Sequence, residues 1–452
     1  MTDRVEAYIE ENQPRFIEEL KEFMRFASVS AQRDHDGDTR ACAEWLVAHL
    51  RKLDLDAQLV DVGGQPIVRA AAKGKAGRRA VIYGHYDVQP EDPLDEWKTP
   101  PFEPTIRDGI LYGRGATDDK GQLFAHVKAV ESLLATEGQL PCEVVFLIEG
   151  EEESGGDALP RYIKQARAEL ACDAVIVSDS TMYDADTPAI TNGLRGILAF
   201  EFTVKGPNSD VHSGAYGGAV ANPAMVVAQM LAACVSPEGK VLVPHFYDDV
   251  APLEDWEREG FGKLAFDDGA LARELEVPRL HGEPGYSTLE RLWARPTFEV
   301  NGIFGGYQGQ RSKTIIPAGA TAKISIRLVP HQDPARVRDA VFAHLRAVCP
   351  DTVRLEIPDS AMMSPPVLFD VNTPVIRAAE EALRKGFGRE PAFIRCGGSI
   401  PVVSTFVEQL QCPVVLMGFG LDSDRPHGPN EHFSLDSFRR GTKAAAHLLR
   451  TI

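Results

Sequence analysis

The sequence has no run of about 20 consecutive apolar residues, the length that an α-helix needs to cross a bilayer, so we expect no membrane span. It is also poor in cysteine, with seven among 452 residues, scattered and without a Cys-x-x-Cys spacing. Such an odd, dispersed set is typical of reduced thiols in a cytoplasm and not of a disulfide framework. The N-terminal segment contains Asp3 and Glu6 and lacks the basic and then apolar pattern of a secretory signal. A cytoplasmic protein is therefore expected.

Positive charge is also in short supply. The chain has 48 Lys and Arg against 66 Asp and Glu, which gives a formal net charge of −18. Such a surface repels phosphate groups, so neither nucleic acid nor an anionic membrane is expected as a partner. No internal repeat and no low-complexity tract is present, which argues against a solenoid and against a disordered linker.

The order of the predicted elements indicates two domains, as expected for a chain too long for one hydrophobic core. Strand-like and helix-like segments alternate through Asp179, which predicts an α/β fold with a mixed, largely parallel sheet. Residues 197–204 and 322–329 then alternate like half-buried strands, and helices are predicted over 223–234 and 334–348. These strand–helix units predict a small α+β, ferredoxin-like domain inserted into the first. The predicted boundaries are 1–193 and 359–452 for the outer domain and 194–358 for the insertion.

Three apolar segments that are predicted strands lead directly into side chains able to bind a metal. They are followed, in chain order, by His85, by the acidic run 149–153 and by Asp179. Because parallel sheets collect ligands beyond the carboxyl ends of their strands, these groups are expected to meet there. One His and several carboxylates are the ingredients of a divalent-metal site. The three segments are 80–84, 144–148 and 174–177.

Each of these signals has an ordinary structural alternative when taken alone. His85 could use Asp87 to orient its imidazole for a metal, or it could be a turn histidine capped by that Asp. Asp118 and Asp119 follow a Gly-rich bend, where they could bridge two metals or cap a helix. The run 149–153 could supply a ligand and a proton shuttle, or it could be a solvated helix start.

The C-terminal part adds a second candidate histidine. His427 and His432 both follow the predicted strand 413–417, and the residues alone do not choose between them. Asp179 follows the strand 174–177 and could be a metal ligand or an ordinary capping residue. Together the segments supply two histidines and at least three carboxylates, enough for two zinc-like ions that share one carboxylate. Paired sites of this type hold their metals about 3.5–4 Å apart with a water or hydroxide between them.

In this order, the segments resemble the M20 family of dinuclear zinc peptidases and deacylases. The likeness is closest to the cytosolic nonspecific dipeptidase and carnosinase branch, and it covers essentially the whole chain. Five separated motifs at compatible spacing carry the resemblance. They are Gly84-His85-Tyr86-Asp87-Val88-Gln89-Pro90, Leu111-Tyr112-Gly113-Arg114-Gly115, Asp118-Asp119-Lys120-Gly121, Asp210-Val211-His212-Ser213-Gly214 with Tyr216-Gly217-Gly218, and Gly397-Gly398-Ser399-Ile400-Pro401.

The resemblance implies a role for each candidate ligand. His85 and Asp179 would hold one metal ion, Glu153 and His427 the other, and Asp118 would bridge the two. It also implies that Asp87 orients His85, that Glu152 is the general base, and that the peptide bond between Asp118 and Asp119 is cis.

Two positions depend on how the family pattern is aligned. The family usually has two glutamates before Ser-Gly, and here there are three. Alignment on Ser154-Gly155 makes Glu152 the base and Glu153 the ligand, whereas a slip of one residue would make them Glu151 and Glu152. The Asn-Glu that follows His427 matches the family, which favours His427 over His432.

The insertion resembles the lid and dimerisation domain of the family. His212 would then reach the metal site of the partner subunit and stabilise the developing oxyanion, and Arg327 would bind the carboxylate of the substrate. Thr314, Gly398 and Ser399 are expected to help bind the substrate. Without the resemblance, His212 would be taken for a loop histidine and Arg327 for a solvated strand residue.

The resemblance therefore predicts a cytosolic, homodimeric, two-metal dipeptidase in which a bridging hydroxide attacks short peptides and Glu152 moves the proton. Zinc is the expected metal, and manganese or cobalt would suit the same ligands. One alternative is an N-acyl amino acid deacylase or carboxypeptidase on the same fold. An alternative of another class is a non-catalytic metal-binding regulator, against which the retention of every expected ligand and of Glu152 counts.

Overall fold

The computed structural model describes residues 3–359, 361–398 and 400–452, and its contacts group the chain into two compact units. Unit 1 consists of Met1–Asn192, Phe369–Ile394 and Thr405–Ile452, and unit 2 of Gly193–Leu368 and Arg395–Ser404. The contacts thus assign a short second segment, Arg395–Ser404, to unit 2, whereas the sequence pattern assigned all of 359–452 to the outer domain. No helix of the described residues combines the length and the apolar character needed to cross a membrane.

Unit 1 is built on a six-stranded sheet in the order β1-β2-β6-β3-β7-β18. The two pairs β1–β2 and β2–β6 are antiparallel, and the pairs from β6 through β3 and β7 to β18 are parallel. This confirms the predicted mixed α/β sheet. The strands are β1 (Asp56–Val60), β2 (Ile67–Ala72), β3 (Arg79–His85), β6 (Glu143–Glu149), β7 (Ala174–Val177) and β18 (Val414–Leu416).

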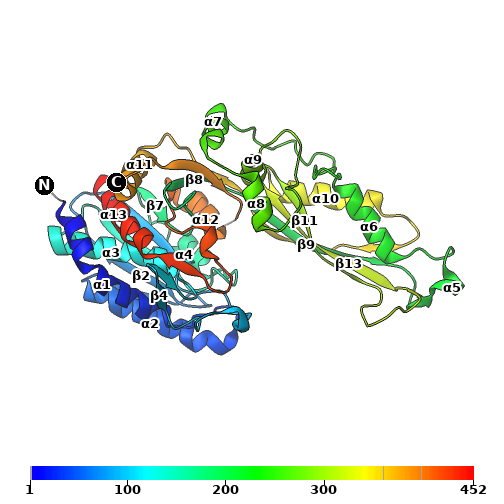
Figure 1. Ribbon diagram of the computed structural model, residues 1–452, viewed down its shortest axis with the longest axis horizontal. Coiled ribbons are helices and arrows are strands. Elements are labelled where there is room, and N and C mark those ends of the chain that lie inside the picture. Colours follow the sequence, from blue (N-terminus) through cyan, green and yellow to red (C-terminus); the bar gives the residue numbers. More distant parts are fainter. Residues whose placement is uncertain (1–2, 360, 399) are drawn as a thin grey trace. The chain divides into compact units, whose positions relative to one another are not determined.

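Helices cover this sheet and supply most of the core of unit 1. In Figure 1, α1, α3 and α13 lie side by side, and they contact one another, with α11 packed against α13. Helix α3 is buried along nearly its whole length, because it lies between α1, α13 and the sheet. The helices are α1 (Arg4–Met24), α2 (Asp36–Lys52), α3 (Lys120–Glu137), α4 (Ala158–Ala166), α11 (Pro374–Phe387), α12 (Pro401–Leu410) and α13 (Leu435–Thr451).

The described residues also form two small three-stranded sheets. Their orders are β19-β5-β4 and β16-β8-β17. The strands are β4 (Thr105–Arg107), β5 (Ile110–Tyr112), β8 (Ala189–Leu194), β16 (Val367–Leu368), β17 (Ala392–Cys396) and β19 (His432–Ser434), and single 3₁₀ turns occupy Arg33–His35, Leu94–Glu96 and Asp422–Asp424.

Unit 2 has an antiparallel sheet in the order β11-β13-β9-β14, with β15 also paired to β9. Residues of β9 and β13 are buried alternately, and the buried set packs against α6 and α10. The elements are β9 (Gly196–Lys205), β10 (Val211–His212), α5 (Ser213–Tyr216), α6 (Pro223–Cys234), β11 (Thr297–Gly305), β12 (Ile315–Ile316), β13 (Gly319–Leu328), α10 (Pro334–Val348), β14 (Arg354–Glu356) and β15 (Met362–Ser364).

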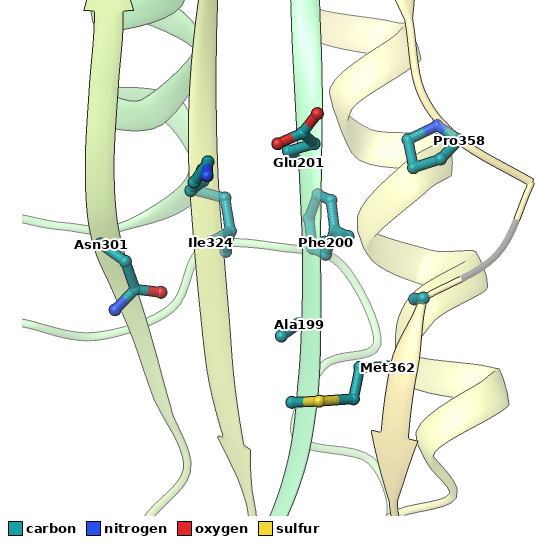
Figure 2. Close-up of a pocket in the computed structure, with 9 residues that line it drawn as sticks. Ala199, Phe200, Glu201, Asn301, Ile324, Pro358 and Met362 are labelled. Atoms are coloured by element: carbon teal, nitrogen blue, oxygen red, sulfur yellow. The ribbon is translucent and has the colours of Figure 1, made fainter. Parts of the chain in front are cut away.

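The opposite face of this sheet carries a shallow hollow of about 440 Å³. Figure 2 shows Glu201 of β9, Asn301 of β11 and Ile324 of β13 along it, with Pro358 and Met362 at its side. Polar and apolar side chains are mixed here, and Met362 is 60% exposed. The helices α6 and α10 therefore cover the face of the sheet opposite to this hollow.

The acidic stretch between residues 236 and 295, whose periodicity is weak, forms three short helices in unit 2. They are α7 (Asp255–Lys263), α8 (Asp268–Glu274) and α9 (Thr288–Ala294). Glu257 of α7 makes a buried bidentate ion pair with Arg395 of β17, with nitrogen–oxygen distances of 2.8 and 2.6 Å. This pair links segments 138 residues apart, and both of its residues belong to unit 2.

Candidate metal centre

The predicted ligands meet because three neighbouring parallel strands end at one edge of the unit 1 sheet. Strand β3 ends at His85, which is paired with Glu149 at the end of β6. On the other side of β3, Tyr83 is paired with Val177, the last residue of β7. Parallel neighbours deliver their carboxyl-terminal residues to the same edge, so the loops that follow them come together there.

Two groups of possible ligands form there and share one residue. His85, Asp118 and Asp179 make the first group, and Asp118, Glu153 and His427 the second; within each, the ligand atoms lie within 4.8 Å of one another. His85 Nε2 is 3.0 Å from Asp118 Oδ1 and 3.9 Å from Asp179 Oδ2. His427 Nε2 is 2.9 Å from the other oxygen of Asp118 and 3.4 Å from Glu153 Oε2. Asp118 therefore presents one oxygen to each group.

Asp118 is positioned by a buried carboxylate that the sequence analysis gave no role. Glu431 accepts hydrogen bonds from the backbone amides of Gly115, Thr117 and Asp118, at 3.0, 3.0 and 3.1 Å. Its other contact is an ion pair with Arg114 at 2.8 Å. Glu431 thus holds the loop that presents Asp118, and the peptide bond between Asp118 and Asp119 is cis, as the resemblance implies.

Asp87 holds the acidic loop as well as the histidine. The Nδ1 atom of His85 lies 3.0 Å from the carbonyl oxygen of Asp87 and 3.5 Å from its carboxylate. The same carboxylate accepts the backbone amides of Glu152 and Glu153, at 3.3 and 3.1 Å, and the hydroxyl of Ser30 at 2.6 Å. Through these contacts Asp87 sets both the imidazole and the two glutamates in place.

The three adjacent glutamates have different surroundings. Glu153 belongs to the second ligand group, and Gln89 Nε2 donates to its carboxylate at 2.7 Å. Glu151 accepts from the backbone amide of Gln65 at 2.9 Å and lies outside both ligand groups. Glu152 lies between them in sequence and interacts electrostatically with His85 and Asp179. This geometry favours the alignment in which Glu152 is the base and Glu153 the ligand.

The two candidate histidines of the C-terminal part are also separated. His427 lies in the second ligand group, whereas His432 Nδ1 is 3.0 Å from the carbonyl oxygen of Asn430. The ring of His432 packs against Tyr112, with 5.0 Å between ring centroids. The described residues thus bring His427, and not His432, to the cluster.

Burial and mutual repulsion make this site unfavourable for so many charged carboxylates. Burial, then repulsion from Asp179 and Glu153, raises the pKa of Glu152 to about 9, and burial with repulsion from Asp118 raises that of Glu153 to about 8. Burial alone would lower the pKa of His85, but hydrogen bonds to Asp118 and Asp179 outweigh it and raise this pKa well above its usual value.

The donor set fits divalent cations of the zinc type. Each ligand group offers one imidazole nitrogen and oxygens from two carboxylates, which suit zinc, manganese and cobalt. Cations in these two positions would offset the repulsion that raises the pKa values of Glu152 and Glu153. The residues present therefore fit a pair of metal ions with Asp118 between them.

The predicted substrate residues of unit 2 fall in two places. His212 and Thr314 are exposed and adjacent, because β10 pairs with β12 and the amide of Ser213 donates to the carbonyl oxygen of Thr314 at 3.0 Å. Arg327 lines a cavity of about 550 Å³ together with Arg195, whose pKa falls to about 10 through burial and repulsion from Arg327.

Gly398 belongs to unit 2 and donates its amide to Cys396 Sγ at 3.3 Å. Ser399, predicted beside it, lies outside the described residues. The sequence analysis also missed Glu431 and Gln89 as supports of the ligands. Gln89 stands inside the first motif that carries the resemblance, and Glu431 is the Glu of the Asn-Glu that follows His427, so their places in the chain were the available signal.

The chain matches peptidase family M20/M25/M40 over residues 81–451. It belongs to this family and is a peptidase of the metal-dependent M20 type. It is 32% identical to the Beta-Ala-His dipeptidase of Homo sapiens over 99% of this chain and 92% of that protein. It is 31% identical to the Cys-Gly metallodipeptidase DUG1 of Saccharomyces cerevisiae, over 98% of this chain and 96% of the yeast protein.

A solved structure extends the comparison to three dimensions. The M20 family metallo-carboxypeptidase Sso-CP2 from Sulfolobus solfataricus is 33% identical and aligns over 96% of this chain and 98% of its own, with a TM-score of 0.85. The fold is therefore the mixed α/β fold of M20 peptidases. Similar proteins of this fold include both dipeptidases and a carboxypeptidase.

Proposed function

We propose that this protein is a dimeric, cytoplasmic, two-metal dipeptidase that hydrolyses short peptides with free termini. The observation that carries the proposal is the pair of ligand groups joined by Asp118, next to Glu152, which interacts electrostatically with His85 and Asp179. Dipeptides are the proposed substrates because relatives aligned over nearly the whole chain are named dipeptidases.

The metal sites are proposed as follows. His85 and Asp179 hold one ion, Glu153 and His427 the other, and Asp118 bridges them. Zinc is the proposed metal, since a mixture of His and carboxylate ligands suits it. When bound, the two ions would polarise the scissile carbonyl and lower the pKa of a water molecule.

The side chains of this protein do the rest of the chemistry. Glu152 takes a proton from the attacking water and hands it to the leaving amine. With the metal ions bound, the repulsion that raises its pKa would be offset, so that its carboxylate is available as a base. Asp87 holds the backbone of Glu152 in place. We assign binding of the substrate to Arg327, Thr314, Gly398 and Ser399, with Arg327 on its carboxylate as a bidentate donor.

We assign unit 2 the role of a lid and dimerisation domain, with His212 serving the metal centre of the partner subunit. The exposed position of His212 and Thr314 supports this assignment, because neither side chain is buried within its own unit. The dispersed cysteines support a cytoplasmic location.

The general base is tested by Glu152→Gln, with Glu151→Gln as the matched control. We expect Glu152→Gln to keep its metal and to lose about 10²–10⁴-fold in kcat on dipeptides, because proton transfer is removed. Glu151→Gln should stay within a few-fold of wild type, since Glu151 lies outside both ligand groups. A Glu152→Gln variant that hydrolyses dipeptides at the wild-type rate would remove Glu152 from the mechanism.

The second candidate function is that of a carboxypeptidase, which the similarity to the Sulfolobus structure supports. A panel of free dipeptides, longer peptides and N-acyl amino acids separates the two. Preference for free dipeptides supports the proposal. Higher kcat/KM on longer peptides or on N-acyl amino acids would favour the carboxypeptidase or deacylase instead.

A further inference from the structure

Two cysteines far apart in the sequence are in direct contact in unit 1. The Sγ atoms of Cys172 and Cys412 are 3.3 Å apart, although 240 residues separate them in the chain. A disulfide has an S–S bond of about 2.05 Å, so the two sulfurs need to approach by only a little more than 1 Å to be joined. Neither residue belongs to the metal centre described above.

The pairing of two strands in the sheet brings Cys172 and Cys412 together. Cys172 lies two residues before β7 and Cys412 two residues before β18, and these strands are parallel neighbours with Val414 paired to Val175. The amide of Val175 also donates to the carbonyl oxygen of Pro413 at 2.9 Å. The entry points of both strands, and with them the two thiols, are therefore held at one edge of a buried sheet.

The segment that carries Cys172 is anchored on its other side by Arg79. Its Nη1 donates to the carbonyl oxygens of Glu169 and Ala171, at 2.7 and 3.0 Å. The amide of Arg79 donates to Asp173 Oδ2 at 2.7 Å. Cys172 thus stands in a tethered turn and not in a free loop, which keeps the thiol pair in register.

Solvent reaches this pair. Both cysteines are half-buried, and Cys172 lines a surface hollow of about 310 Å³ together with Arg79 and Glu143. By contrast, Cys42 and Cys142 are buried, and their thiols point to the carbonyl oxygens of Tyr86 and Leu449. Cys172 and Cys412 thus combine a thiol–thiol contact with partial exposure to solvent.

The two thiols are also chemically unequal. The hydrogen bond with Cys172 lowers the pKa of the Cys412 thiol, and the same contact raises that of Cys172. Cys412 is therefore the thiol that is more readily ionised, and thiolates are the attacking species in thiol–disulfide exchange.

We propose that Cys172 and Cys412 form a reversible thiol–disulfide site that reacts with low-molecular-weight disulfides such as oxidised glutathione. The site does not depend on peptidase activity. In the first step, the Cys412 thiolate attacks one sulfur of the glutathione disulfide, and one glutathione thiolate leaves. Cys172 then loses its proton to solvent, attacks Sγ of Cys412 and expels the second glutathione thiolate. The protein loses two electrons and two protons, and one glutathione disulfide becomes two thiols.

The test is to incubate the native, reduced protein with glutathione at graded ratios of the oxidised and reduced forms, and to map the peptides by mass spectrometry. We expect a Cys172–Cys412 cross-link that forms before any other cysteine is modified and that dithiothreitol reverses. The oxidised protein should unfold at a higher temperature than the reduced protein, because the cross-link restricts the unfolded chain.

Three variants make the result decisive. Cys172→Ser should stop at a mixed disulfide between glutathione and Cys412, because the resolving thiol is gone. Cys412→Ser should react much more slowly at Cys172. Cys349→Ser, at another half-buried cysteine, should form the cross-link as the wild type does. Separate glutathione adducts on Cys172 and Cys412 of the wild type, or no reaction of either thiol in fully oxidised glutathione, would overturn the proposal.

Discussion

At the scale of single residues, the buried side chain of His49 shows that the interior of unit 1 disfavours a positive charge on this imidazole. His49 of α2 is 7% exposed and stacks on Trp45, with 4.9 Å between ring centroids. Burial, and then the charge of Lys128, lowers its pKa to about 4 from a usual value of 6.5. His49 is therefore neutral in the folded protein at pH 7.

This shift predicts how stability depends on pH. Between about pH 6.5 and pH 4 the unfolded chain binds a proton at His49 and the folded protein does not, so stability falls as the pH falls through this window. The loss from this one group is at most about 3 kcal/mol. Urea unfolding of the metal-free protein at pH 7 and pH 4.5 measures it. His49→Gln should reduce the pH dependence, and the same change at exposed His245 should not.

One outcome of the urea unfolding experiment would contradict the prediction about His49. If His49→Gln and His245→Gln show the same loss of stability between pH 7 and pH 4.5 as the wild type, His49 accepts its proton without penalty in the folded protein.

At the scale of elements, the first three helices are joined by a buried polar cluster. Lys128 of α3 contacts Glu19 of α1 and lies 3.1 Å from His49 Nε2 of α2 and 2.7 Å from Glu131 of its own helix. The Lys128 side chain is fully buried, so its charge depends on these partners.

Lys128→Met should therefore be strongly destabilising, because it removes the buried cation of Glu19 and Glu131 and leaves them with Arg15, whose side chain is 41% exposed. We expect a loss of about 3–5 kcal/mol in the free energy of unfolding, as for other buried pairs that lose one partner. Lys21→Met is the matched control, since Lys21 of α1 pairs with Glu18 at the surface and should cost less than about 1 kcal/mol. Equal effects in the two variants would show that the cluster contributes nothing beyond a surface pair.

The same helices show what periodicity can and cannot predict. The apolar spacing of Ile9, Phe16 and Leu20 predicts the buried face of α1, and all three are fully buried. In α3 the spacing predicts one buried face through Leu123 and Val127, but Lys120, Gln122 and His126 are buried as well. Polar residues at buried positions have partners on other elements, and a single helix pattern holds no information about them.

At the scale of the whole molecule, the order of the motifs predicted which side chains gather at the metal centre. Apolar strands that end in His85 and near Asp179 were readable, because parallel strands share one carboxyl edge. The assignment of Arg395–Ser404 to unit 2 was not readable, since contacts between segments far apart in the chain, such as the ion pair between Arg395 and Glu257, leave no local pattern in the sequence. The hydrogen bond that Glu431 accepts from the amide of Asp118 was not predicted either, because the two residues are 313 positions apart in the chain.

The proposed assembly gives a prediction about complementation between subunits. His212→Ala should lose most activity and keep its metal, and Asp118→Asn should lose both. If His212 serves the partner subunit, mixed dimers of the two variants should recover about half of wild-type activity per dimer, because one of the two sites in each mixed dimer is then complete. Asp118→Asn mixed with His85→Ala should recover none. Verified mixed dimers of His212→Ala and Asp118→Asn without activity would place His212 in its own subunit.

The metal content per chain of the wild type, Asp118→Asn and Asp179→Asn, measured after zinc loading and removal of free metal, tests the shared centre most directly. We expect about two ions in the wild type, about one in Asp179→Asn and nearly none in Asp118→Asn, because Asp118 alone among the described residues belongs to both ligand groups. One ion in the wild type, or two ions retained by Asp118→Asn, would contradict the shared centre.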